Sequence, residues 1–366
     1  MSEKVSVDTG VIKNTLLKAL DLRASDIHIT AMKRPVMRID GILTELKDLE
    51  VWQELHVLAF FQMLQIRYPF SGAESEDSLN TSFTMNGTRF RMHAYKSFTG
   101  VSVALRVIPL EIPEFDNLNL PNSIRDLIKN KNGLVLVTGS TGSGKSTTLA
   151  SLLNEVKNDP EGKKLIVTVE NPIEFLYEET NARIIQREVG KNVKSFGSAV
   201  VDAMREDPDI ILIGELQDKD AIRNALTLAE TGHLVLASLH TNGAAETFDR
   251  ILDAFPGDDH AQIRTKLANS LQGIVHQRLV KKSGVTGRIP LVEVLTLDDA
   301  DVRNQLRNNS SVTNVNKLMK EKSGKGLISI ERSAAMLVKD GLLNIEDAVK
   351  YADVKKEDIN RILNTL

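Results

Sequence analysis

A run of nine residues has the types and spacing of a phosphate-binding loop. Residues 139–147 read GSTGSGKST, which fits the pattern G-x-x-x-x-G-K-[ST]. Glycines let the backbone curl so that its N–H groups point at phosphate oxygens, and the N-terminus of a following helix adds partial positive charge. Lys145 is expected to reach the β- and γ-phosphates, and the Ser146 hydroxyl is expected to bind Mg²⁺. The residues predicted to bind ATP are Gly139, Ser140, Thr141, Gly142, Ser143, Gly144, Lys145, Ser146 and Thr147.

The flanks of this run decide against a chance glycine-rich turn. GLVLVTG (133–139) is a continuous apolar run, typical of a strand covered on both faces. An amphipathic stretch with Leu149, Leu152, Leu153 and Val156 follows, as a helix requires. ATP is favoured over GTP because the sequence has no N-K-x-D motif.

An acid follows a second apolar run directly. In DPDIILIGELQD (207–218) four apolar residues lead through a glycine to Glu215. A carboxylate beside a hydrophobic core costs roughly several kcal/mol without a partner. Ligands of doubly wound sheets bind beyond the carboxyl ends of the strands, so Glu215 is expected to face the nucleotide. It acts there either as a general base on the attacking water, which we favour, or as a ligand of Mg²⁺ through a water molecule. A helix cap is the alternative, but Asp218 fits that role better.

Polar residues also follow two other apolar runs. Glu170 comes after LIVTV and is expected to assist with Mg²⁺ or water, with a solvated turn as the alternative. His233 and His240 bracket LVLASL, so they cannot share a site directly. Taken alone, a histidine at a strand end is more often structural.

These residues require an α/β fold with a parallel sheet, because strand-like and helix-like segments alternate from residue 122 onward. The residues before 109 predict instead a small α+β domain, in which TRFRMHAY (88–95) has a basic face with Arg89 and Arg91, and the next strand carries Arg106. The elements expected there are a helix at 9–20, a strand at 27–30, a hairpin with an Asp40–Gly41 turn, a helix at 52–65, and strands at 88–95 and 101–109.

Prolines and acids at 109–121 predict a linker between the two domains. From about residue 298 the pattern becomes helical, with Ser329 and Asn344 as expected N-caps and Gly341 as a helix stop. The predicted division is therefore 1–108 for the N-terminal α+β domain, 109–121 for the linker, 122–297 for a P-loop domain, and 298–366 for a C-terminal helical region.

Composition excludes several classes of protein. The chain has 366 residues, of which 42% are hydrophobic, and a formal net charge of −3. This charge disfavours a general nucleic-acid binder. The sequence has no cysteine, which excludes disulfides and thiolate metal sites and suits the cytosol. No run of eighteen apolar residues is present, and the first residues lack a signal-peptide pattern, so we expect a cytoplasmic protein.

Several segments together resemble the secretion ATPase superfamily, the hexameric motors of type II and type IV secretion and of type IV pili. They are ASDIHI, RIDG, GLVLVTGSTGSGKSTTLA, VENPIEF, DPDIILIGELQD and AETGHLVLASLHTNGAAETFDRILDAFP. The resemblance covers nearly the whole chain and is closest to the retraction ATPases of type IV pili. Extension and type II secretion motors are longer and usually carry a four-cysteine zinc element, which this chain lacks.

The resemblance implies roles for particular residues. VENPIEF resembles the family's Asp box, and DPDIILIGE resembles the Walker B segment with Glu215 as catalytic glutamate. The block around His233 and His240 resembles the His box, which makes both histidines candidate catalytic residues. Arg205 and Arg250 match recurring arginines of the catalytic domain.

The family's architecture implies a RecA-like ATPase domain, a PAS-like N-terminal domain, and a ring of six subunits in which N-terminal domains close over the nucleotides. Arg89, Arg91 and Arg106 are then candidate arginine fingers, with a merely solvated sheet face as the alternative. The implied partner is an inner-membrane platform protein of a pilus or secretion machine. The chain would bind the inner face of the cell membrane through that protein only, and no nucleic acid is expected.

The sequence departs from the retraction branch at four positions. DADVRNQLRNN (299–309) resembles that branch's A-I-R-N-L-I-R element but has Asp301 for alanine and Gln305 for leucine. Gln217 replaces the arginine usual after the catalytic glutamate, and Asn171 replaces the usual aspartate. A motor of type IV secretion, of a conjugative pilus or of a type II-like system therefore stays open. Two other classes are a nucleotide-gated module without turnover and a nucleic-acid motor, the latter disfavoured by the acidic balance.

Overall fold

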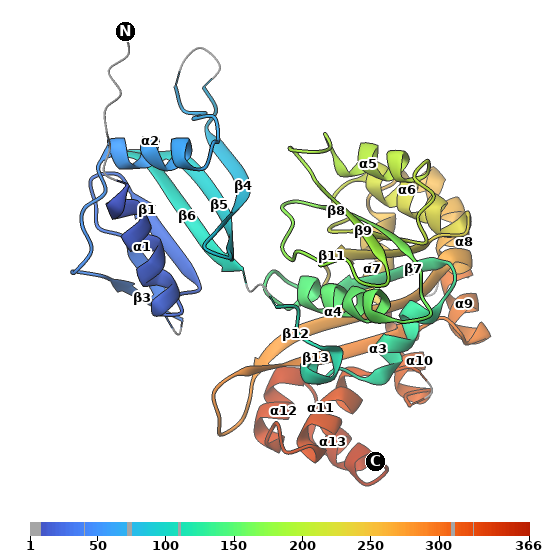
Figure 1. Cartoon of the computed structure of the whole chain (residues 1–366). Helices are drawn as coiled ribbons and strands as arrows, with labels where there is room; N and C mark the ends of the chain where they lie inside the picture. The colour runs from blue at the N-terminus through green and yellow to red at the C-terminus, as the bar shows by residue number, and fades with distance from the viewer. Residues whose placement is uncertain (1–8, 40, 72–74, 109–110, 309–311, 325) are drawn as a thin grey trace. The chain divides into compact units, whose positions relative to one another are not determined.

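The computed structural model forms two units, each with its own sheet (Figure 1). It describes residues 9–39, 41–71, 75–108, 111–308, 312–324 and 326–366. The first unit comprises Met1–Glu111 with Glu174–Leu176, and the second comprises Ile112–Ile173 with Tyr177–Leu366.

The first unit is an antiparallel sheet covered on one face by two helices (Figure 1). Its elements are α1 (Gly10–Asp21), β1 (Asp26–Thr30), β2 (Val36–Ile39), β3 (Ile42–Glu45), α2 (Glu54–Met63), β4 (Ser78–Met85), β5 (Thr88–Ser97) and β6 (Gly100–Ile108). The strand order is β3-β2-β1-β6-β5-β4. Period-two alternation explains the single covered face, because Phe90, Met92 and Ala94 of β5 are buried while Arg91 and His93 are half-buried on the other side.

Most of the expected elements of this unit are confirmed within two residues. The structure adds β4, which the sequence analysis missed because SLNTSFTM has polar residues at both faces. The predicted hairpin is present as β2 and β3, but Asp40 of its turn lies outside the described residues. The expectation of an α+β domain before residue 109 agrees with this unit.

The second unit is built on a seven-stranded sheet in the order β13-β12-β7-β11-β10-β8-β9. Neighbouring strands are parallel except for β12 and β13, so β13 is an antiparallel edge strand. The strands are β7 (Gly133–Thr138), β8 (Leu165–Glu170), β9 (Arg183–Glu188), β10 (Ile210–Ile213), β11 (Leu234–Leu239), β12 (Leu271–Lys281) and β13 (Arg288–Thr296). The expected α/β fold with a parallel sheet is confirmed.

Helices cover both faces of this sheet, which is why the central strands read as continuous apolar runs. Along β7, Leu134 and Leu136 enter one core, whereas Val135 and Val137 enter the other. The first core also takes α5 (Phe196–Ala203), α6 (Lys219–Glu230), α7 (Glu246–Leu252), α8 (His260–Ser270), α9 (Ala300–Arg307) and α10 (Val312–Glu321). The second takes the 3₁₀ helices η1 (Phe115–Leu118) and η2 (Leu127–Lys129), together with α3 (Asn122–Asp126) and α4 (Lys145–Asn158). A third 3₁₀ helix, η3 (Gly257–Asp259), precedes α8.

Three strands of this sheet, β9, β12 and β13, were not expected. In β12 the sequence LQGIVHQRLVK mixes apolar residues with Gln277 and His276, and RIIQRE of β9 alternates weakly. Such patterns do not separate a strand from a loop without knowledge of the neighbouring strands. Of these, β9 and β12 nonetheless position residues of the candidate site.

The boundary between the units falls inside the range expected for the linker, between Glu111 and Ile112. Residues 109 and 110 of that range lie outside the described residues. Further along, Phe115 is buried in the second unit, with the Arg125 guanidinium 4.7 Å from its ring centroid. The second half of the predicted linker is therefore anchored to the second unit.

The C-terminal region is helical from α9 onward, as expected. Besides α9 and α10 it contains α11 (Ile330–Lys339), α12 (Ile345–Ala352) and α13 (Lys356–Leu363). The predicted N-caps are confirmed, since the Ser329 and Asn344 side chains accept hydrogen bonds from backbone N–H groups of α11 and α12. Gly341 follows α11 with φ +70°, a conformation that glycine adopts without strain.

Trp52, the chain's one tryptophan, lies in the core of the first unit, so its fluorescence follows the unfolding of that unit. Its ring is fully buried, lies 5.8 Å from that of Phe60, and donates Nε1–H to Thr15 Oγ1 at 3.0 Å. We predict that Phe60→Ala lowers the free energy of unfolding of this unit by about 3–5 kcal/mol, because it leaves a cavity in the core. Chemical denaturation followed by tryptophan fluorescence measures this change.

Leu55→Ala is the matched control, since Leu55 lies on the same helix but is exposed. It should change the free energy of unfolding by about 0.5 kcal/mol or less. Equal destabilisation by both variants would contradict the assignment of Phe60 to the core.

Candidate nucleotide-binding site

Four candidate segments meet at one edge of the second unit's sheet. The strands β7, β11, β10 and β8 are neighbours in that order and run parallel, so their carboxyl ends lie side by side. Gly139 directly follows β7, His240 directly follows β11, Glu215 lies two residues beyond the end of β10, and Glu170 ends β8. The parallel sheet thus brings together residues that are far apart in the sequence.

The phosphate loop connects β7 to α4, as the motif requires. The buried Lys145 ammonium donates hydrogen bonds to the carbonyl oxygens of Gly139 at 3.0 Å and Ser140 at 2.9 Å. Ser146 is exposed at the start of α4, where a hydroxyl is accessible to a metal ion. Among the described residues the buried Ser143 hydroxyl has no hydrogen-bond partner. Ser143 and the start of α4 therefore offer donors that fit a phosphate group.

The carboxylate of Glu215 lies next to two polar side chains. His240 Nε2 is 3.2 Å from Glu215 Oε1, and Gln217 Nε2 donates to Glu215 Oε2 at 2.8 Å. Glu215 is about one-third exposed, so water reaches it. Gln217, which stands where the retraction branch has arginine, thus contacts the predicted catalytic glutamate.

Backbone contacts between strands fix the position of Glu215. Gly214 donates its N–H to Val169 O at 2.7 Å, and its carbonyl accepts from Ser238 Oγ at 2.5 Å. Leu216 N donates to Ser238 O at 3.0 Å. Glu215 is therefore held on both sides, with β8 and β11 as its supports.

Glu170 is more buried than Glu215 and is oriented by its own neighbours. Its Oε1 accepts from Thr168 Oγ1 at 2.7 Å and from Gln186 Nε2 of β9 at 3.4 Å. Gly214 keeps the two acids close, because a Cβ there would lie only 3.3 Å from Glu170 Cα. Glu170 also contributes, after burial, to raising the pKa of Tyr177 well above its ordinary value.

His233 precedes β11 and His240 follows it, so the two histidines lie at opposite ends of this strand. His233 Nδ1 is 3.2 Å from Leu228 O and 3.3 Å from Thr231 Oγ1, both at the end of α6. The strand of six residues spans about 20 Å, so His233 cannot reach the phosphate loop of its own subunit. The sequence expectation that the two histidines do not share a site agrees with this placement.

The predicted arginines fall in both units. Arg205 follows α5 and Arg250 lies in α7, and both are exposed. In the first unit Arg89 is buried and donates to Ser82 Oγ at 2.7 Å. Arg91 and Arg106 are paired across β5 and β6, with side chains 40% and 60% exposed.

Each of these two arginines has a carboxylate partner: Glu174 Oε1 lies 3.6 Å from Arg91 Nη1, and Asp26 pairs with Arg106. Asp26 is the cross-strand partner of Arg106, whose Nε donates to Asp26 Oδ1 at 2.9 Å. Burial would raise the pKa of Asp26, but hydrogen bonds from Arg106 and Ser25 outweigh it and hold the pKa below its ordinary value. The guanidinium of Arg106 is thereby oriented in the sheet.

Sequence reasoning missed the contribution of β12, whose His276 and Gln277 lie beside the loop. His276 Nδ1 is 3.2 Å from Thr138 Oγ1, one residue before the loop. Burial, helped by the charges of Arg278 and Lys145, lowers the pKa of His276 to about 4. Its imidazole is therefore neutral at pH 7. No motif marked these residues, because their position depends on pairing between β12 and β7.

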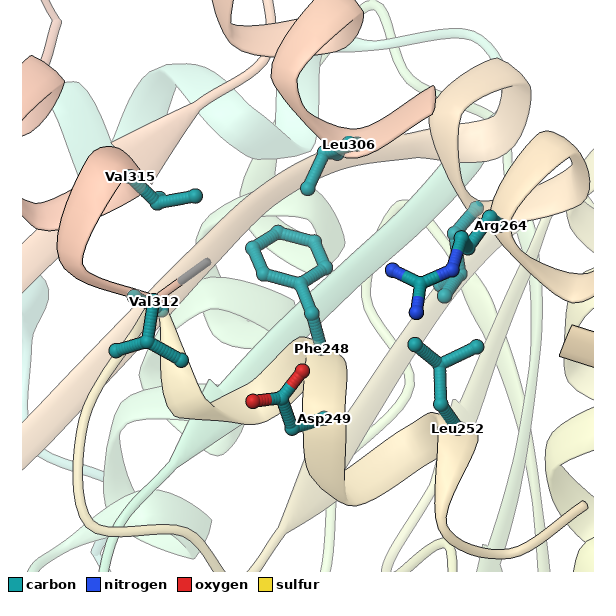
Figure 2. A pocket seen from close by; sticks show the side chains of 9 residues that line it. Phe248, Asp249, Leu252, Arg264, Leu306, Val312 and Val315 are labelled. Carbon is teal, nitrogen blue, oxygen red and sulfur yellow. The ribbon is translucent and has the colours of Figure 1, made fainter. Parts of the chain in front are cut away.

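A separate pocket of about 370 Å³, counted out to solvent, lies on the other face of the sheet from α4. Figure 2 shows the Phe248 ring near the centre of the view, with the Asp249 carboxylate below it and the Arg264 guanidinium to its right. Leu306 extends into the pocket from α9, the helix within DADVRNQLRNN, whose final Asn309 lies outside the described residues. The lining residues are Ala245, Phe248, Asp249, Leu252, Arg264, Leu267, Leu306, Val312 and Val315. The pocket is mainly apolar and is distinct from the phosphate loop.

Other features of α9 account for the sequence departure at Asp301. The Asp301 and Asp299 carboxylates both accept hydrogen bonds from Lys322 Nζ, at 2.5 and 2.6 Å. Arg303 Nη1 donates to Ala268 O at 2.8 Å, which ties α9 to α8. The aspartate at position 301, where the retraction branch has alanine, therefore anchors this helix.

Comparison with known proteins gives the family. The family model described as type II/IV secretion system protein matches residues 3–350. The chain belongs to this family. The predicted membership of the secretion ATPase superfamily is thereby confirmed.

Relatives within the secretion family match along almost the whole chain. The type IV pilus retraction ATPase PilT of Pseudomonas aeruginosa is 37% identical over 336 residues, covering 90% of this chain and 95% of that protein. A crystal structure of the pilus retraction motor PilT with bound ADP is similar with a TM-score of 0.83 at 38% identity, covering 94% of this chain and 98% of that one. The ATPase DotB of Legionella pneumophila is similar with a TM-score of 0.77 at 26% identity, covering 96% and 98%.

Two features are absent from the part of the chain that the structure describes. No helix in that part is long and apolar enough to cross a membrane. Nor do three or more His, Cys, Asp or Glu side chains come together there as a metal site.

The depressed pKa of His276 predicts how stability depends on pH. Well above pH 6.5 the ring is neutral in both the folded and the unfolded state, so its contribution to stability is fully present. As the pH falls from 6.5 towards 4, the unfolded chain binds a proton that the folded chain excludes, and stability is lost. This loss amounts to about 3 kcal/mol at most.

We predict that His276→Asn flattens this dependence, because asparagine keeps a polar group near Thr138 but does not titrate. Denaturation followed by circular dichroism at pH 7.5 and pH 4.5, without nucleotide, measures it. If the free energy of unfolding fell by the same amount between pH 7.5 and pH 4.5 in the parent and in the variant, His276 would not titrate differently on folding.

Proposed function

We propose that this chain is an ATPase motor whose hydrolysis of ATP drives retraction of a type IV pilus. One observation carries the catalytic part of this proposal: the Glu215–His240 pair, 3.2 Å apart, stands at the same sheet edge as the phosphate loop. A nucleotide held in that loop would place its terminal phosphate toward this edge. Retraction as the mechanical output is supported by the similarity to PilT.

The phosphate loop binds and orients the triphosphate. Backbone N–H groups of 139–147 point at phosphate oxygens, and Lys145 neutralises charge on the β- and γ-phosphates. Ser146 and Glu170 would hold Mg²⁺, directly or through water, and the ion supplies charge neutralisation between the phosphates. The exposed hydroxyl of Ser146 and the Glu170 carboxylate, which ends β8 at the same edge of the sheet, supply oxygen ligands of the kind that this ion takes.

Glu215 acts on the attacking water. A water oxygen attacks the γ-phosphorus, Glu215 accepts the proton, and the bond to ADP breaks with release of phosphate. His240 and Gln217 fix the two oxygens of the carboxylate, so it is oriented before the water arrives. His233, at the far end of β11, takes no part in this step within its own subunit.

Charge on the transferred group needs further cations, which we assign to the first unit of a neighbouring subunit in a ring of six. Arg91 and Arg106 are the better candidates for arginine fingers, because both side chains are partly exposed and stand side by side. Arg89 is buried against Ser82 and supports the strand instead. Arg205 and Arg250, exposed in the second unit, are the remaining candidates for contacts between subunits.

The proposed partner is a platform protein of the inner membrane, which would hold the ring at the cytoplasmic face. A motor of a secretion system is the second candidate, and the family's description as type II/IV secretion system protein favours it. Nucleic acid is not proposed as a partner, in keeping with the net charge of −3.

We predict that Glu215→Gln lowers kcat for ATP hydrolysis about 100-fold or more, because an amide cannot accept the proton from water. The affinity for ATP should stay within about threefold, since the phosphate loop is unchanged. Steady-state phosphate release and calorimetric titration with ATP measure the two effects.

Asp218→Asn is the matched control, since it removes one negative charge three residues away. Asp218 caps α6 by accepting from Ala221 N at 2.8 Å, and asparagine caps equally well. Its kcat should match the parent. Full activity of Glu215→Gln, or equal losses in both variants, would refute the role given to Glu215.

The biological output is tested by deleting the gene and counting surface pili. A retraction motor predicts excess pili on the deletion strain, which return to normal when the parent gene, but not Glu215→Gln, is restored. Loss of pili would indicate assembly instead, and normal pili with blocked export would indicate secretion.

A further inference from the structure

The side chain of Gln277 is buried between the phosphate loop and the helix that follows it. Gln277 lies in β12, which pairs with β7 so that His276 is level with Thr138, the last residue before the loop. Only 1% of Gln277 is exposed. The strand pairing therefore delivers this amide to the base of the loop.

Both ends of the amide are used on the nucleotide-binding segment. Gln277 Nε2 donates to Ser143 O at 2.6 Å, and Gln277 Oε1 accepts from Thr148 Oγ1 at 2.8 Å. A neutral amide is a suitable side chain here because it offers a donor and an acceptor on one rigid group. One residue thus ties the middle of the loop to the first turns of α4.

The same strand also explains two glycines of the loop. A Cβ on Gly139 would overlap the carbonyl oxygen of Gln277, and one on Gly144 would lie 2.8 Å from Gln277 Nε2. Both glycines have positive φ, +141° and +93°. The loop is glycine-rich here because β12 packs against it, in addition to its need for unusual backbone angles.

Because the Gln277 amide is buried, its two hydrogen bonds favour one conformation of the loop. A buried amide that loses its partners costs about 1–3 kcal/mol for each unsatisfied group. Any shift of Ser143 away from Gln277 would leave such groups unpaired, whereas the observed conformation satisfies them. The loop is therefore held in one shape before a ligand arrives, which raises the affinity for that ligand.

We propose that Gln277 is a positioning residue that holds the phosphate loop in its nucleotide-binding shape, so that it sets the affinity for the phosphates of ADP and ATP. The proposal rests on the nucleotide site proposed above. Because the loop contacts the phosphates before and during hydrolysis alike, Gln277 affects KM far more than kcat.

Gln277→Met tests this, because methionine has a similar length and apolar bulk but no amide. We expect the Kd of the full chain for MgADP, measured by calorimetry, to rise at least tenfold. KM for ATP should rise by a similar factor, while kcat at saturating ATP changes less than threefold.

Gln272→Met is the matched control on the same strand. Gln272 Nε2 donates to the backbone oxygen of Asn132 at 3.0 Å, at the other end of β7, so it makes the same kind of bond far from the loop. Its Kd for MgADP should stay within twofold of the parent. A purely structural role for Gln277 predicts that both variants lower the melting temperature in the absence of nucleotide and that neither changes Kd.

Thr148→Val provides a second route, which does not depend on the folding of Gln277→Met. It removes the hydroxyl that donates to Gln277 Oε1 and keeps the shape of the side chain. We expect a rise in Kd of threefold or more, and the double variant with Gln277→Met should bind within twofold of Gln277→Met alone. If the fold-changes in Kd of the two single variants instead multiply in the double variant, Thr148 does not act through Gln277.

The outcomes separate the two proposals. If the parent binds MgADP and Gln277→Met or Thr148→Val binds it within twofold, the role of Gln277 is refuted and the proposed function stands. If the parent binds neither MgADP nor MgATP, both proposals fall.

Discussion

Parallel pairing of four central strands is the constraint on which the candidate site depends. Ile213 of β10 pairs with Val169 and with Ala237, and Leu239 of β11 pairs with Thr138. This register aligns the strand ends to within a residue or two. A glycine-rich turn, two acids and a histidine from separate motifs consequently meet at one edge, and any slip of a strand would separate them.

The site resolves an electrostatic problem that its own residues create. Glu215 follows a fully buried strand, where an isolated carboxylate would be unstable, but it leaves the core at the sheet edge and contacts His240 and Gln217. On the other side, Lys145 points back to the loop carbonyls. Opposite charges are thus set at the same edge of the sheet, beyond the ends of β7 and β10, an arrangement suited to binding a triphosphate and activating a water molecule beside it.

The first unit handles its own charges in a similar way. Arg91 and Arg106 are direct neighbours across two strands and would repel each other, but Asp26 of the next strand pairs with Arg106 and orients it, and Glu174 pairs with Arg91. A sheet face that keeps two guanidinium groups ordered and partly exposed is suited to binding phosphate. The hexameric arrangement proposed above would give that face its ligand.

The sequence by itself determined the phosphate loop, the family, the parallel sheet and the C-terminal helix caps at Ser329 and Asn344. These features are encoded locally, in contiguous residues whose backbone conformation, polarity or apolar run is decided within a few positions. Tertiary structure alone decided that His240 and not His233 contacts Glu215, that Gln217 joins them, and that Gln277 supports the loop. The contacts of Glu215 with His240 and of Gln277 with the loop join segments that follow or form different strands, and the pairing of β12 with β7 has no signature in the sequence of either. Local patterns specify elements, whereas the order and register of strands specify which side chains meet.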